Sequence, residues 1–380
     1  MGRDIPLGRI AGVKVGMDLP VVLVAALNTW LLATNRFPIE SPGLSDQAYW
    51  IAGVFGALLF FVSLLVHEMG HALVARDEGI GVRGISLWLL GGVAKLESSP
   101  TTAKSEFRIA VVGPLASAAC GAVFLVAAYL APDHGTWNLA GNLFAWLGFL
   151  NILLAGFNII PAAPLDGGTV LSSLIWWRTG SQATGMRWAA WAGIATGGAI
   201  VYLGIRDLGR DGSTFGIWFL FVGGFILVNA LQSSRAAPLY QLLDGARVGD
   251  AMATDPPTAL GSTSVADFLR ALPRPTTHQA YPVLGDHGRV TGLLTASAMR
   301  AVSPDQWETL RVSDLAFPLD RITTVGSDEP LLPALQKIDG GEVRDGLVVG
   351  PDGRIVGTID ASALHHFVER RKAQLSTHSP

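Results

Sequence analysis

Apolar side chains form long, nearly uninterrupted runs over roughly the first 235 residues. A helix needs about 20 mostly apolar residues to cross the hydrocarbon core of a bilayer. About six runs approach that length, and they cover residues 19–34, 49–75, 107–131, 141–160, 188–205 and 215–231. The pattern therefore predicts an α-helical polytopic membrane domain over residues 1–235, followed by a tail in which charges are interspersed.

Two mixed segments, residues 8–15 and 84–96, are too short to span a membrane. They are predicted either as strands at the membrane surface or as plain connecting loops. The first apolar run is short enough for a secretory signal peptide, but no clear small-residue cleavage site follows it. An uncleaved span is therefore favoured.

The composition agrees with a membrane protein, since half of the 380 residues are hydrophobic and 15% are charged. The single cysteine, Cys120, excludes an internal disulfide and a cysteine-based metal cage. The formal net charge is −3 and no block of like charges occurs, which argues against nucleic-acid binding.

Loop charges predict the orientation. Basic residues gather before the first run, after the second and after the fourth. Short cytoplasmic loops carry an excess of Lys and Arg, so both termini and the tail are expected to face the cytoplasm of a multi-pass cell-membrane protein. After the fifth run Arg206 and Arg210 are balanced by two aspartates, which leaves the orientation of the last two runs open.

The second run carries three ionisable side chains, in the segment His67-Glu68-Met69-Gly70-His71. Histidines four residues apart stand on one face of a helix, so His67 and His71 can direct ring nitrogens at one cation. Glu68 stands beside the first histidine, where it can take a proton from the attacking water. Ionisable groups in a span are costly, which favours a functional site over the alternative, a polar cluster paired with another helix.

A catalytic zinc ion usually has three protein ligands, so a third is expected elsewhere. Asp166 is the candidate, because it follows the fourth run in a segment broken by Pro161 and Pro164. Gly167 and Gly168 allow close backbone approach there. Irregular backbone at membrane depth is tolerated where it lines a cavity. Taken alone, the segment would equally fit a membrane-exit turn.

Over roughly the first 235 residues the chain resembles the site-2 protease family of intramembrane zinc metalloproteases. The likeness rests on the His67–His71 motif, Gly91-Gly92, Gly113-Pro114 and residues 158–168. The resemblance implies one zinc ion per chain, bound by His67, His71 and Asp166. It also implies that Glu68 is the general acid and base.

The resemblance further implies that Asn158 positions the substrate or the oxyanion, for which a helix-end cap is the alternative. It implies that the segment containing Gly91 and Gly92 holds an unwound substrate. A helical peptide bond is shielded by its own hydrogen bonds and by lipid, so a substrate span must unwind before attack. The expected substrate is a single-span membrane protein or a remnant peptide.

The tail contains two similar units, residues 245–305 and 308–370. Each begins with a similar short segment and later has two apolar strands joined by a Gly turn and followed by a helix. The turn is Asp286-His287-Gly288-Arg289 in the first unit and Pro351-Asp352-Gly353-Arg354 in the second. The pair resembles tandem cystathionine-β-synthase (CBS) domains, which implies one α/β module.

Tandem CBS domains often bind adenine nucleotides, with a Thr or Ser followed three residues later by Asp as the ribose contact. In the first copy Ala298 stands three residues after Thr295, where the pattern has Asp. In the second copy Asp360 stands where the pattern has Thr or Ser, and Ala363 stands where it has Asp, so both copies depart from that pattern. An adenine nucleotide therefore remains one alternative, beside homodimer formation and a docking surface.

The predicted function is a zinc metalloendopeptidase that hydrolyses peptide bonds within or near transmembrane segments, that is, regulated intramembrane proteolysis with the CBS pair as regulatory module. The alternatives are a CBS-regulated membrane transporter or channel, and an inactive relative that only binds substrates. A transport site has no evident need for Glu68 beside His67 at this spacing. The retained set of two histidines and two acids argues against an inactive relative.

Overall fold

The computed structural model describes residues 5–88, 91–211, 214–243, 245–272, 278–285, 288–352 and 354–377. The chain divides into two compact units, Met1–Ala237 and Pro238–Pro380.

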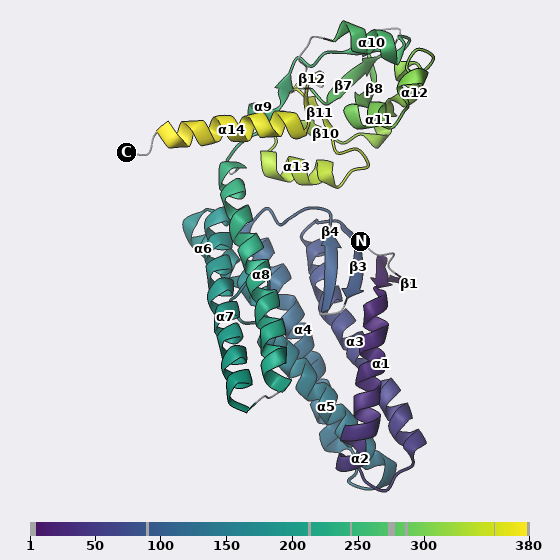
Figure 1. Cartoon of the computed structure of the whole chain (residues 1–380), viewed down its shortest axis with the longest axis vertical. Coiled ribbons are helices and arrows are strands. Elements are labelled where there is room, and N and C mark those ends of the chain that lie inside the picture. Colours follow the sequence, from purple (N-terminus) through teal and green to yellow (C-terminus); the bar gives the residue numbers. More distant parts are fainter. Residues whose placement is uncertain are drawn as a thin grey trace. The chain divides into compact units, whose positions relative to one another are not determined.

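The first unit is built from long helices (Figure 1). They are α1 (Leu19–Leu31), continued by η1 (Leu32–Arg36) and α2 (Phe37–Glu40), then α3 (Asp46–Asp77), α4 (Ala103–Leu130), α5 (Gly135–Asn158), α6 (Asp166–Thr179), α7 (Gln182–Asp211) and α8 (Thr214–Leu243). Among the described residues, 6 helical segments are long and apolar enough to cross a membrane, which confirms the prediction of about six spans. Large apolar side chains stay exposed on them, such as Leu23 at 71% and Val123 at 67%, as expected of surfaces that face lipid.

Helix α4 is central to the arrangement because it packs against α3, α5 and α6. Its start is capped by the Thr102 hydroxyl, which accepts a hydrogen bond from the Ser105 amide at 3.1 Å. The start of α3 is capped in the same way by Ser45. These caps mark where α3 and α4 begin.

A four-stranded sheet accompanies these helices, with the order β1-β2-β3-β4. Its strands are β1 (Ile5–Ile10), β2 (Val13–Met17), β3 (Val82–Trp88) and β4 (Gly91–Leu96). The strand alternative for the two short mixed segments is thus confirmed. Strands β2 and β3 are parallel, while the other neighbours are antiparallel. In the described residues β4 pairs on one side only, so it is an edge strand.

The second unit repeats one pattern of elements. The first copy has α9 (Val248–Ala251), β5 (Ala253–Thr254), β6 (Ala259–Leu260), α10 (Val265–Ala271), β7 (Ala280–Leu284), β8 (Val290–Thr295), α11 (Ala296–Arg300) and η2 (Pro304–Gln306). The second has α12 (Val312–Leu315), β9 (Phe317–Pro318), η3 (Leu319–Arg321), β10 (Thr324–Gly326), α13 (Leu331–Asp339), β11 (Gly346–Val349), β12 (Ile355–Ile359) and α14 (Ala361–Thr377).

The two copies exchange strands. The sheets have the orders β6-β7-β8-β9 and β10-β11-β12-β5, so each copy contributes its short strand to the sheet of the other. This confirms the predicted α/β CBS pair and explains why it is one module.

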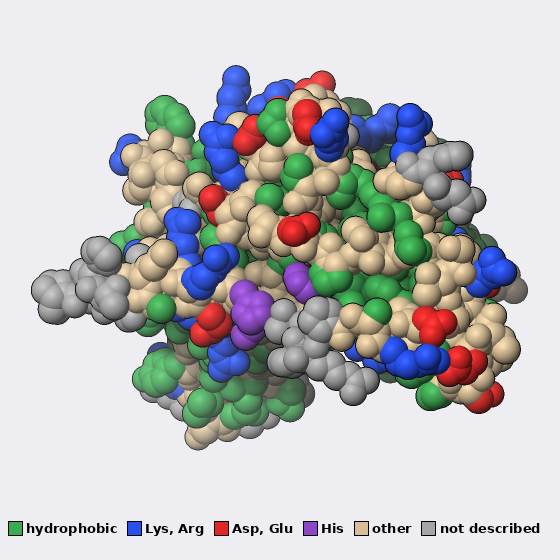
Figure 2. Space-filling view, turned by 90° about the horizontal axis from the view of Figure 1, so that it is seen from above, with side chains coloured by type: hydrophobic (Ala, Val, Ile, Leu, Met, Phe, Trp, Pro, Cys, Tyr) green, Lys and Arg blue, Asp and Glu red, His purple; other side chains and the backbone are tan. Residues whose placement is uncertain are grey.

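Of the predicted turn residues, Asp286, His287 and Gly353 lie outside the described residues. Acidic and basic side chains are interspersed over the face of the tail seen in Figure 2.

Candidate metal centre and active site

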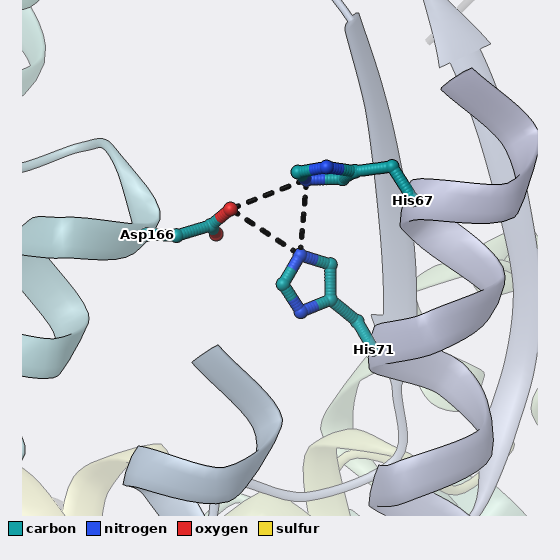
Figure 3. Close-up of side chains that lie close together, drawn as sticks. All are labelled: His67, His71 and Asp166. Carbon is teal, nitrogen blue, oxygen red and sulfur yellow. Dashed lines mark hydrogen bonds and ion pairs between the residues drawn. The ribbon is translucent and has the colours of Figure 1, made fainter. Parts of the chain in front are cut away.

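His67 and His71 lie one turn apart on α3, and both rings point toward Asp166, the first residue of α6 (Figure 3). The two Nε2 atoms are 3.2 Å apart. Asp166 Oδ2 lies 3.2 Å from His67 Nε2 and 3.4 Å from His71 Nε2. Tetrahedral ligands that bind zinc at about 2.0–2.2 Å are themselves about 3.4 Å apart. The donor atoms therefore form a triangle of the size that a zinc ion requires.

Helix α4 orients both histidine rings. The Nδ1 atom of His71 lies 2.6 Å from the carbonyl oxygen of Ile109, which can only accept a hydrogen bond. The Nδ1 atom of His67 lies 2.9 Å from the hydroxyl of Ser117. A hydrogen on Nδ1 leaves the lone pair of Nε2 directed at the metal position, as outer partners of metal-binding histidines commonly ensure.

Ile109, Gly113 and Ser117 are spaced by four residues, so they form one stripe along α4. A methyl group at Gly113 would overlap the Nε2 atoms of both histidines, so only glycine lets the helix approach this closely. Ser117 was not predicted from the sequence. The available signal was weak, because a serine in an apolar run is also compatible with ordinary helix packing.

Asp166 reaches the histidines because the helical course is interrupted before it. Helix α5 ends at Asn158, and α6 begins at Asp166 itself. Gly167 packs under the carbonyl groups of Ile159 and Ile160, where a side chain would overlap them. The predicted break is present, whereas the helix that starts with the aspartate was not foreseen.

Glu68 follows His67 and is buried, with its side chain against Gly92 of β4. The Gly92 main chain donates a hydrogen bond to the carboxylate. A cavity of about 410 Å³ opens beside these groups. It brings together every site residue predicted from the sequence, namely His67, Glu68, His71, Gly91, Gly92, Asn158 and Asp166.

Another carboxylate in this cavity wall, that of Glu106, was missed by the sequence reasoning. The predicted third span began at residue 107, whereas α4 begins at Ala103 and includes Glu106 in its first turn. An acid at the edge of an apolar run was the signal that could have identified it.

The chain is similar to known proteins over most of its length. The model of peptidase family M50 matches residues 55–134 and 133–201, and that of the CBS domain matches residues 248–304. "Putative zinc metalloprotease Rip3" of Mycobacterium tuberculosis is 36% identical over 368 residues, covering 97% of this chain and 93% of the relative. "Putative zinc metalloprotease sll0528" of Synechocystis is 30% identical over 369 residues, covering 96% and 95%. The solved site-2 protease from Methanocaldococcus jannaschii is 27% identical and covers 61% of this chain and 95% of its own, with a TM-score of 0.41.

Proposed function

Because the chain belongs to peptidase family M50, the site-2 protease family, we propose that it binds its catalytic zinc through His67, His71 and Asp166. The chain is an intramembrane zinc metalloprotease with a CBS tail. The observation that carries the ligand assignment is the triangle of donor atoms, with sides of 3.2 to 3.4 Å. The transporter alternative gains no support from the relatives, which are named as proteases.

Glu68 is the proposed general acid and base. When bound, zinc polarises the scissile carbonyl and lowers the pKa of a water molecule at the site. The Glu68 carboxylate lies in the same cavity as the three ligands, so it can accept a proton from the attacking water. It then delivers that proton to the departing amine, so that one side chain serves both halves of the hydrolysis.

Strand β4 and Asn158 are proposed to position the substrate. Among the described residues the outer edge of β4 pairs with no further strand, so an extended segment can add there, and its Gly91 and Gly92 line the cavity. Asn158 lines the same cavity at the end of α5, where its amide can donate to a substrate carbonyl or to the developing oxyanion. A single-span protein or a remnant peptide would unwind locally to occupy this edge.

Removal of the metal tests this function. Full-length enzyme in detergent is incubated with a panel of single-span proteins from the same cell, before and after treatment with 1,10-phenanthroline. We expect cleavage to fall to background with the chelator and to return on addition of one zinc ion per chain, because zinc supplies the polarisation of the carbonyl. Cleavage that persists in protein shown to be metal-free would contradict the proposal.

We propose that the tail, with CBS copies at 245–305 and 308–370, acts through homodimer formation rather than through a nucleotide. The Thr295 hydroxyl accepts from the Ala298 amide at 3.1 Å, and Asp360 accepts from the Ala363 amide at 2.7 Å. Both side chains at the expected ribose-contact positions therefore cap helices, and neither copy has the acid expected three residues later.

Calorimetry distinguishes these alternatives for the tail. Titration of residues 240–380 with ATP and with AMP is expected to give no saturable heat at millimolar ligand. Light scattering on the same sample is expected to give the mass of a dimer. Saturable nucleotide binding by a monomeric tail would overturn the proposal.

We also propose that both termini and the tail face the cytoplasm. Basic side chains gather where α3 ends and α4 begins, at Arg76, Lys104 and Arg108, whereas Asp46 and Asp133 lie at the opposite ends of these helices. A cysteine introduced into the tail of a Cys120→Ser background should react with a membrane-impermeant maleimide only after cell lysis. Labelling in intact cells would reverse the orientation.

A further inference from the structure

Glu106 is a carboxylate of the catalytic cavity to which the proposed mechanism gives no role. Glu106 is buried, with only 9% of its surface exposed. Its Oε2 atom is buried and has no hydrogen-bond partner among the described residues. Burying a carboxylate without a partner is costly, so the cavity wall has a strong acceptor that a ligand entering the cavity can satisfy.

The position of Glu106 relates it to the reaction centre. Glu106 precedes Ile109 by three residues and Gly113 by seven, so it lies on the stripe of α4 that faces the two histidines. A helix rises 1.5 Å per residue, which places Glu106 about 10 Å along the axis from Gly113. The carboxylate is thus too far away to join the metal site, yet it is in the same cavity.

Strand β4 lines the same cavity as Glu106 and gives the spacing of residues along a bound substrate. It runs from Gly92, beside Glu68, to Leu96, which lines the cavity together with Glu106. An extended chain advances about 3.3 Å per residue. A substrate segment extended along β4 would cover the distance of about 10 Å to Glu106 with about three to four residues.

The chemistry of that substrate residue follows from the membrane. Glu106 lies at the end of the spans where this chain has Arg76, Lys104 and Arg108. Membrane proteins inserted by the same rule carry lysine and arginine at the corresponding end of their own spans. A basic side chain also forms the strongest hydrogen bond with a buried carboxylate.

We propose that Glu106 is a specificity-determining residue that binds a lysine or arginine side chain of the substrate, about three to four residues from the cleaved bond. This inference rests on the proposed proteolytic function. It makes a basic residue near the end of the substrate span a requirement for efficient cleavage, in addition to an unwound peptide bond.

A scanned reporter series tests the inference. A single-span protein cleaved by the wild type is prepared with one arginine, or one glutamine as the neutral counterpart, at each of the positions flanking the cut. Full-length wild type, Glu106→Gln and Glu106→Lys are compared by kcat/KM. Glu97→Gln is the matched control, since the Glu97 carboxylate packs against Gly81 and does not line the cavity.

The wild type and Glu97→Gln are expected to prefer arginine about tenfold to a hundredfold over glutamine at one position, as for a charge-assisted hydrogen bond. Glu106→Gln should lose most of that preference while keeping its zinc and its cleavage of the glutamine reporter. Glu106→Lys should instead prefer a glutamate at the same position. The same arginine preference in wild type and Glu106→Gln would overturn the inference, and reporter cleavage unchanged by Glu68→Gln would overturn the proposed function itself.

Discussion

Glu68→Gln is expected to abolish peptide cleavage while the protein keeps its zinc. Glutamine has nearly the same shape as glutamate, so the contact with Gly92 and the packing of α3 should survive. It cannot accept the proton of the attacking water, and positioned proton transfer contributes about 10²–10⁴-fold to such rates. Cleavage of the single-span panel should therefore fall by at least two to four orders of magnitude, measured by product formation from purified protein.

The matched control for this experiment is Glu97→Gln, which removes the same charge from a carboxylate outside the cavity and should cleave as the wild type does. Zinc content and thermal unfolding of each variant separate a chemical defect from misfolding. Identical products from wild type and Glu68→Gln would show that the proteolytic mechanism proposed here is wrong.

Asp166→Ala is expected to lose zinc, because it leaves two of the three protein ligands. Removal of an outer hydrogen-bond partner typically weakens metal binding about 10- to 100-fold, and loss of a direct ligand should cost more. Zinc retained after dialysis against a weak chelator should fall from one per chain to near zero, measured by elemental analysis. Ser117→Ala, which removes only the partner of His67 Nδ1, should give an intermediate loss.

Asp133→Ala is the control for metal loss, since this exposed aspartate lies between α4 and α5, far in sequence from the ligands. Asp166→Asn preserves the size of the side chain and distinguishes loss of the ligand charge from loss of packing. Unchanged zinc in both Asp166 variants would exclude this residue as the third ligand.

Local pattern was sufficient for much of the architecture. Span length and the period of the tail strands depend on neighbouring residues, so the membrane helices and the CBS pair were predictable. The same holds for the shared face of His67 and His71, since a spacing of four residues determines it within one helix. Asp166 could be predicted as the third ligand because the prolines and glycines around it indicate an interruption of regular structure.

The tertiary structure decided what surrounds these residues. The carbonyl of Ile109 and the hydroxyl of Ser117 meet the histidines from a helix that begins more than thirty residues later, and no local pattern encodes which face of α4 turns toward α3. The exchange of β5 and β9 between the CBS copies likewise depends on pairing between distant segments.

Sequence alone therefore determined the membrane spans, the histidine pair with its adjacent acid, and the candidate third ligand. Each of these follows from residues that are close neighbours in the chain. Only the folded chain showed that one cavity joins them and that Glu106 forms part of its wall. The physical reason is that a cavity is a property of helix and strand packing, in which side chains far apart in the chain become neighbours.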